Sequence, residues 1–501
     1  MSDPEGGLKE LATSSRVDGK TTLIDLPPEL ILRIASLLEV RDLLAFRRTH
    51  RFIHTISQDK LLWGSIFHDL RLPLPRTLRS RHLDSLSYPE LENAVLHSCM
   101  VEHWWLKERK AVFTLPAMNS SYRLLDFLDD RWVISIPVNG SPVIWDTREI
   151  PPKLYQLCES TSHAFRTETS GATVAVDPHQ GDIIIGLRKN LRDRSTSQIL
   201  RVHLADPKAD CLQLTAYKTI DHLSHAIIAL EPSRNAVITD SISAGIEIGD
   251  WIRSRVVGIS TPNDYEFAFI LGVRLVGDYI LSFRSTCIEL LSVPPFPDTD
   301  GQITYETNPA SYRFHLNYPD LAFTGASLSE PQQNPESPED SRIVYILAHQ
   351  TTIGFFYFRV TIYNPDYVPS GPRARMDVDL LGVYELRRPR VRHREEVGTR
   401  LVLGGRLGPE GKRGLWTERS LSKLKRFVVA ASFDQSCSEA VAVESGDDLR
   451  ELCEIAPRIE STSDVFVVDS WSPDDDIVRC AFSEATGKIV LGTRDNRIIL
   501  L

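Results

Sequence analysis

IDLPPELILRIASLLEVRDLLAFRRTHRFIHTISQDKLLWGSIF, residues 24–67, is the stretch that decides how this chain is organised. Pro27 and Pro28 suit the first turn of a helix, where a missing backbone N–H costs nothing. Apolar residues then recur at i, i+4, i+7 and i+8, which predicts one apolar side of a helix: Leu30, Ile34, Leu37 and Leu38. A second helix is expected to follow almost at once, with Asp42 as its N-cap. About forty residues cannot bury this much apolar surface alone, so the pattern predicts a small helical module that needs a partner.

The order of short motifs in this stretch resembles the F-box. The motifs are Leu-Pro-Pro-Glu-Leu (26–30), Ile-Ala-x-Leu-Leu (34–38), Arg-Asp-Leu-Leu (41–44) and Leu-Leu-Trp (61–63). Many F-boxes carry Cys and Trp in the second half, where this chain has His50 and Phe52. The resemblance implies docking on the Skp-family adaptor of cullin-type ubiquitin ligases. Without it, the segment would read as an ordinary amphipathic helical hairpin.

The docking half of the motif supplies the candidate binding residues. By resemblance these are Leu26, Pro27, Pro28, Glu29, Leu30, Ile34, Leu37, Leu38, Leu43 and Leu44. Some of these leucines must instead fill the core of the module, and the sequence does not sort them.

Composition bounds the rest of the chain. With 501 residues and 42% hydrophobic residues, it is long enough for two or three globular domains. The net charge of −10 argues against nucleic-acid and membrane partners, and no apolar run is long enough to span a bilayer. The seven cysteines are dispersed without a C-x-x-C pair, which favours the cytosol or nucleus and neither a disulfide framework nor a zinc site. Residues 1–20 are expected to be a disordered tail, before an F-box over 21–68.

A linker with one helix is predicted for residues 69–111. Ser87 and Glu90 have the spacing of a capping box, and the periodicity that follows predicts a helix over 89–107. Trp104 and Trp105 are expected to seat this helix against the next domain. A peptide-binding aromatic patch is the alternative.

From residue 112 the chain reads as an all-β domain. The segments 172–188, 226–241 and 479–494 each repeat an apolar strand, a polar turn and a second apolar strand, and 127–146 and 275–293 form a similar pair. Units spaced by about 40 to 55 residues predict a degenerate WD-like β-propeller with about seven blades. A pair of β-sandwiches is the alternative. The fold class is thus a multidomain α+β chain, with helices first and a propeller over 112–501.

The end of the sequence predicts a closed ring. The run 488–501 alternates strand and turn, and its last strand is expected to complete a blade beside Val112, Phe113 and Leu115, which removes an open sheet edge.

Three segments between strands have unusual composition. The stretch 326–342 is rich in Pro, Ser, Glu and Gln and is expected to be a surface loop. The basic run 387–395 favours a solvated loop, with a grip on an acidic or phosphorylated partner as the sharper alternative. Residues 403–414, LGGRLGPEGKRG, are expected to be a loop or hairpin connection, because their spacing is not that of a phosphate-binding loop.

No constellation for catalysis, a cofactor or a metal stands out. His50 and His54 lie four residues apart but lack a third ligand nearby, and Asp474–Asp476 do not have the spacing of a calcium loop. The sequence therefore indicates an adaptor and not an enzyme. The implied role is the substrate-recognition subunit of a Skp–cullin–F-box ubiquitin ligase, whose β domain binds an unknown protein target. A propeller scaffold that binds the adaptor without ubiquitination, and a propeller hydrolase, are the alternatives.

Overall fold

The computed structural model describes most of the chain. The described residues are 23–70, 73–75, 78, 85–115, 121–139, 141–157, 169–190, 195–204, 211–220, 226–240, 245–260, 269–300, 303–307, 312–316, 322–335, 337, 341–351, 353–363, 375–386, 400–420, 425–435 and 439–501. They form two compact units, and the division falls inside helix α6, after Cys99. The predicted disordered tail and the basic run 387–395 lie outside the described residues.

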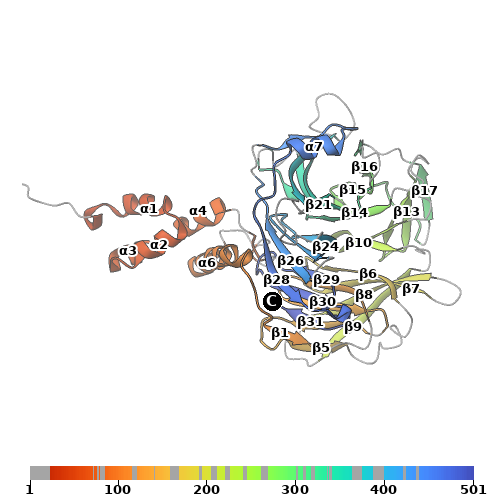
Figure 1. Cartoon of the computed structure of the whole chain (residues 1–501), viewed down its shortest axis with the longest axis horizontal. Coiled ribbons are helices and arrows are strands. Elements are labelled where there is room, and N and C mark those ends of the chain that lie inside the picture. The colour runs from red at the N-terminus through yellow and green to blue at the C-terminus, as the bar shows by residue number, and fades with distance from the viewer. Residues whose placement is uncertain are drawn as a thin grey trace, which may run out of the picture. The chain divides into compact units, whose positions relative to one another are not determined.

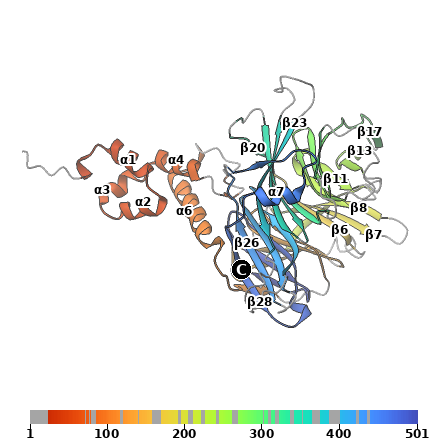
Figure 2. The ribbon, with the colours of Figure 1, turned by 45° about the horizontal axis from the view of Figure 1, so that its top comes forward.

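Short helices build the first unit (Figure 2). They are η1 (Leu23–Asp25), α1 (Pro28–Ser36), α2 (Val40–Arg47), α3 (Arg51–Ile56), α4 (Lys60–Leu70) and α6 (Tyr88–Trp105), of which the part up to Cys99 belongs here. Pro27 and Pro28 stand at the start of α1, as predicted. The capping box is also confirmed, because Glu90 Oε2 accepts hydrogen bonds from the Ser87 N–H (2.7 Å) and hydroxyl (2.8 Å).

The expected second helix does follow almost at once, but its predicted N-cap is wrong. Helix α2 begins at Val40, so Asp42 lies in its first turn and not at the N-cap. Two polar side chains divide the remainder of the segment into α3 and α4. His50 Nδ1 accepts from the Phe52 N–H (3.1 Å) at the start of α3, and Asp59 Oδ1 accepts from the Leu61 N–H (2.7 Å) at the start of α4. His50 is therefore a helix cap.

The second unit is a seven-bladed β-propeller, as predicted (Figure 1). Blade 1 consists of β2 (Tyr122–Leu128), β3 (Trp132–Pro137), β4 (Val143–Asp146) and β5 (Lys153–Leu157). Blade 2 consists of β6 (Thr169–Val176), β7 (Ile183–Asn190), β8 (Ser195–His203) and β9 (Cys211–Ile220). Blade 3 consists of β10 (Ile227–Glu231), β11 (Ala236–Asp240), β12 (Ile246–Asp250) and β13 (Arg255–Ser260). Blade 4 consists of β14 (Ile270–Val276), β15 (Tyr279–Arg284), β16 (Cys287–Ser292) and β18 (Tyr312–His315). The sequence repeats at 172–188 and 226–241 are the two inner strands of blades 2 and 3.

Blades 5 and 6 follow, and blade 5 has the longest described strand, β23 with 11 residues. Blade 5 has β19 (Gly325–Leu328), β20 (Gln332–Gln333), β21 (Ser341–Gln350), β22 (Gly354–Tyr363) and β23 (Arg375–Glu385), and blade 6 has β24 (Arg400–Leu407), β25 (Arg413–Ser420), β26 (Lys425–Ser432) and β28 (Thr462–Asp469). The expected loops at 326–342 and 403–414 are therefore shorter than predicted. Gly404 and Gly405 belong to β24, and only residues 408–412 connect it to β25.

Strands from the two ends of the β domain share blade 7. It consists of β29 (Ile477–Phe482), β30 (Ile489–Thr493), β31 (Ile498–Leu500) and, as its outer strand, β1 (Phe113–Leu115). Phe113 pairs with Leu500 and Leu115 with Ile498 in an antiparallel ladder, and the Val112 N–H donates to Leu500 O (2.8 Å). The predicted closure is confirmed, including the residues expected to form it.

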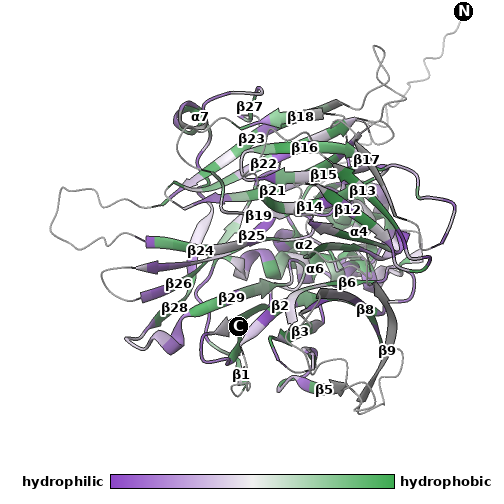
Figure 3. Ribbon diagram, turned by 90° about the vertical axis from the view of Figure 1, so that its right-hand side faces the viewer, coloured by the Kyte–Doolittle hydropathy of each residue, from purple (hydrophilic) through white to green (hydrophobic). Residues whose placement is uncertain are grey.

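An apolar layer fills each of the seven interfaces between successive blades, among the residues that the structure describes. At the closing interface, Leu125 of β2 packs with Val490 of β30 and Ile498 of β31. This continuous ring of layers excludes the alternative of two β-sandwiches, which would bury one layer between each pair of sheets. Figure 3 shows the corresponding apolar residues along the strands.

Two insertions extend a neighbouring blade. β17 (Ile303–Thr307), between the third and fourth strands of blade 4, pairs in parallel with β13 of blade 3. β27 (Val441–Ala442), before helix α7 (Leu449–Ile455) in blade 6, pairs with β23 of blade 5. Each insertion covers an outer sheet edge that would otherwise offer unpaired backbone groups.

Candidate functional site

Helix α1 offers the first candidate surface. Its buried side consists of Ile31 and Ala35, which pack inside the helical unit. On the rest of its surface two leucines are strongly exposed, Leu30 at 48% and Leu37, just beyond the helix, at 82%. Both side chains are therefore accessible to a partner, which would remove their apolar surface from water.

The ten residues predicted to bind the adaptor fall into three groups. Pro27, Pro28, Glu29, Leu30 and Leu37 are exposed; Leu26, Ile34, Leu38 and Leu44 are partly buried. Leu43 is completely buried. Leu43 is therefore corrected from a docking position to a core position, since a side chain with no exposed surface cannot contact a partner of the folded module. The remaining nine stay predictions.

A network of buried polar groups stabilises the helical unit. Arg47 of α2 is buried, forms an ion pair with Glu92 of α6 and donates to the Tyr88 hydroxyl (3.1 Å). Its guanidinium also lies over the ring of the fully buried Trp63, 5.6 Å from the ring centroid. The Trp63 indole N–H in turn donates to Ser57 O (2.8 Å). This packing holds the exposed leucines on a folded scaffold.

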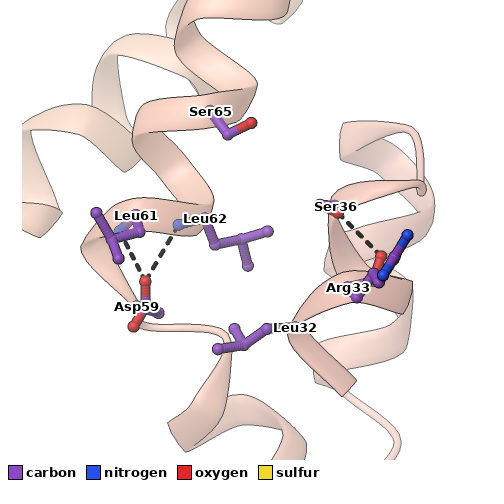
Figure 4. A pocket seen from close by; sticks show the side chains of 7 residues that line it. All are labelled: Leu32, Arg33, Ser36, Asp59, Leu61, Leu62 and Ser65. Atoms are coloured by element: carbon purple, nitrogen blue, oxygen red, sulfur yellow. Dashed lines mark hydrogen bonds between the residues drawn. The ribbon is translucent and has the colours of Figure 1, made fainter. Parts of the chain in front are cut away.

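A pocket of about 310 Å³ lies between α1 and α4 (Figure 4). Its lining residues are Leu32, Arg33, Ser36, Asp59, Leu61, Leu62 and Ser65. Leu61 is 81% exposed, nearly as much as Leu37. The sequence analysis used Leu61 only as part of a motif and missed this pocket, because it forms only when α1 and α4 pack together.

The profile of the F-box-like family matches residues 23–69. These residues are an F-box-like domain. The F-box-like domain and the propeller that follows it are both typical of non-catalytic adaptor and scaffold proteins. A search of the curated proteins found no match.

Several solved structures are similar to the chain at 8–10% identity. The C-terminal WD40 domain of Sif2 has a TM-score of 0.40 at 10% identity and covers 79% of this chain and 98% of its own. The β-propeller domain of Cps50 (Swd1) from Myceliophteria thermophila has a TM-score of 0.45 at 8% identity, with 78% and 98% covered. A chain of the mitotic checkpoint complex has a TM-score of 0.39 at 10% identity, with 78% and 91% covered.

The tryptophans at the end of α6 play different parts within the propeller unit. Trp105 is completely buried, donates its indole N–H to Ala431 O (2.8 Å) and packs against Phe482 at 5.2 Å between ring centroids. Trp104 is 54% exposed, and the Lys107 ammonium lies over its ring, 4.3 Å from the ring centroid. The predicted seating role is correct for Trp105 and wrong for Trp104.

The glycine-rich connection between β24 and β25 does hold an anion, but one that belongs to the protein. The carboxylate of Glu484 accepts backbone N–H groups from Glu410 (2.6 Å), Lys412 (2.7 Å) and Arg413 (3.0 Å). Burial, followed by the nearby charge of Glu410, raises the pKa of Glu484 to about 7, while the three N–H groups act in the opposite direction. The hairpin interpretation is confirmed, and the three backbone N–H groups already have Glu484 as their acceptor.

Neither metal ligation nor a membrane-spanning helix is found in the described part of the chain. No group of three or more His, Cys, Asp or Glu residues is placed to hold a metal ion there. None of its helices is long and apolar enough to cross a bilayer.

Proposed function

We propose that this chain is the substrate-recognition subunit of a Skp–cullin–F-box ubiquitin ligase. The F-box-like domain binds the Skp-family adaptor, and through it a cullin, and the propeller binds a protein target. The observation that carries the proposal is the exposure of Leu30 and Leu37 on a domain that matches the F-box-like family. The chain itself performs no chemistry and uses no cofactor, because recruitment alone raises the effective concentration of target lysines near the conjugating enzyme.

The exposed fractions separate the predicted docking residues that can be replaced without unfolding the domain from those that cannot. Leu30 and Leu37 reach solvent, so replacing both with Ala removes apolar contact area and leaves the core intact. Leu61 is an equally exposed leucine at the α1–α4 pocket and provides the matched control. Leu43→Ala is unsuitable because it opens a cavity in the core.

The test is capture of the full chain by an immobilised Skp-family adaptor. The double variant Leu30→Ala/Leu37→Ala is expected to lose at least tenfold in affinity, while Leu61→Ala binds like the parent. Far-ultraviolet circular dichroism verifies that both variants are folded. Unchanged capture of the double variant would exclude the α1 surface, and loss of capture in Leu61→Ala alone would transfer docking to the pocket.

Ubiquitination needs a separate measurement. A ligase subunit brings the cullin into the same complex, and target proteins accumulate with it when the proteasome is inhibited. If the adaptor co-purifies and the cullin does not, the chain is a scaffold that uses the adaptor for another purpose. The proposal places this activity in the cytosol or nucleus, and nucleic acid and membranes are not among its expected partners.

A further inference from the structure

Three arginines lie together on the innermost strands of three successive blades. Arg406 is on β24 of blade 6, Arg479 on β29 of blade 7 and Arg123 on β2 of blade 1. β29 contacts both β24 and β2, and Figure 3 shows the three strands in succession. Because the innermost strands of a propeller surround its central channel, these residues belong to one part of the channel wall.

Arg123 occupies a β-bulge. Tyr122 pairs with Pro137 and Leu124 pairs with Ile136, so Arg123 has no opposite residue on β3. Bulges of this kind turn a side chain out of the regular packing and are frequent next to functional sites.

None of the three guanidinium groups makes a hydrogen bond or an ion pair with another described residue, and the Nε of Arg123 is buried without a partner. Two other arginines of blade 6 do have carboxylate partners. Arg400 pairs with Asp464 and Glu418, and Arg426 pairs with Asp476. Arg123, Arg406 and Arg479 differ from these two in having no ion pair with a described carboxylate.

The local charge is unbalanced. Part of the Arg479 side chain is exposed to solvent. Its pKa is nevertheless lowered, first because the surrounding protein partly desolvates the guanidinium, and then by the positive charges of Arg406 and Arg123. Burial raises the pKa of the neighbouring Cys480 to about 11, while Arg406 and Arg479 lower it and Asp126 raises it, which places one carboxylate in the same region. Three guanidinium groups and one carboxylate leave a local charge of about +2, which costs free energy unless an anion balances it.

We propose that Arg123, Arg406 and Arg479 form a binding site for a multiply charged oxyanion of the phosphate class in the central channel. A guanidinium presents a planar fork of donors that matches phosphate oxygens, and the local charge of about +2 favours a multiply charged anion. The bound anion joins blades 6, 7 and 1, and blade 7 is where β1 and β31 close the ring. The site lies in the propeller, so it goes beyond adaptor binding by the F-box and does not depend on it.

The test uses the full chain and inorganic pyrophosphate as the probe. Thermal unfolding is followed at constant ionic strength, with sodium chloride replacing pyrophosphate in the reference series, so that general screening is matched. The midpoint is expected to rise with pyrophosphate and to saturate, as binding to the folded state alone requires. Arg479→Gln is expected to weaken binding at least tenfold. Arg253→Gln, which changes an exposed arginine on the turn after β12, is expected to bind like the parent.

The variant also has an outcome that a merely structural arginine would not give. In phosphate-free buffer, Arg479→Gln relieves repulsion and is expected to unfold at the same temperature as the parent or higher. A variant that is equally destabilised with and without pyrophosphate would overturn the proposal. So would a parent protein that responds to pyrophosphate no more than to chloride, or an equal loss of binding in Arg253→Gln.

A competition measurement distinguishes two sources of the oxyanion. Displacement of pyrophosphate by a phosphoserine peptide, and not by its unphosphorylated form, would assign the phosphate to a peptide. Binding of pyrophosphate without displacement by the peptide would assign it to a small molecule. Either result supports the oxyanion site, and adaptor capture in the same samples reports separately on the F-box.

Discussion

Replacing Trp105 with Ala should destabilise the propeller unit strongly, whereas the same change at Trp104 should have little effect. Trp105 has no exposed surface and fills a cluster that contains Leu415 of β25 and Ile477 of β29. The two residues are adjacent and of the same type, so both substitutions change helix propensity equally. A difference in stability between the two variants therefore reports on burial of the side chain.

The magnitude follows from what each side chain contacts. Removing a buried tryptophan leaves a cavity that costs about 3–5 kcal/mol. The loss of its N–H leaves Ala431 O without that donor and adds about 1 kcal/mol. The total of roughly 4–6 kcal/mol approaches the whole stability of many domains. Trp104→Ala loses a partly exposed cation–π contact with Lys107, worth about 0.5–1 kcal/mol.

Urea denaturation of the full chain, monitored by circular dichroism of the β structure, measures both effects. The midpoint of Trp105→Ala should fall far below that of the parent, and that of Trp104→Ala should remain close to it. Trp105→Phe, which keeps most of the apolar volume, should lie between them. Equal midpoints for the two alanine variants would refute the assignment of Trp105 as the anchor of this segment on the propeller.

Three further outcomes are expected. Deleting residues 496–501 removes β31 with four buried apolar side chains, whose burial contributes about 1.5–3 kcal/mol each. Limited proteolysis should therefore spread from the loops through the whole β domain. A truncated protein as resistant as the parent would contradict ring closure. Arg284→Met should lower the free energy of unfolding by about 3–5 kcal/mol, because it removes the guanidinium that lies 2.6 Å from the buried Glu289 carboxylate. Adding Glu289→Leu should restore most of this stability. Equal urea midpoints for the single and double variants would argue against the ion pair. The pKa of Glu484 is raised from 4.5 to about 7, so the folded state binds the extra proton and stability should decline by roughly 3 kcal/mol as pH rises through this interval. Glu410→Gln should make that decline shallower in urea titrations at several pH values, and an unchanged slope would show that the charge of Glu410 does not act on Glu484.

The sequence reveals those features that depend on neighbours in the chain. Ser87 and Glu90 lie three residues apart, and their capping box forms as their spacing predicts. Strand, turn and strand repeats are equally local, which is why 479–494 could be assigned to two strands of one blade. The closing strand was predictable because a propeller has only one place for a final unpaired strand.

Features that depend on packing between distant segments were not predictable. The opposite fates of Trp104 and Trp105 depend on which side of α6 contacts blade 6, which no local pattern encodes. The division of the F-box leucines into exposed and buried ones likewise requires the packed helices. The arginine site combines positions 123, 406 and 479, and only the closed ring brings strands so distant in sequence together.

The pairing of β1 with β31 also means that the propeller can close only after β31 has been synthesised. Residues 498–500 must be made before the ring can close, whereas residues 23–70 are made first. At about 5–20 residues per second, translation of the intervening chain takes on the order of 20 to 90 seconds. During that interval the F-box helices can fold and meet a partner while the propeller is still an open row of blades. Under the proposed function, the order of synthesis thus favours binding of the adaptor before binding of the target.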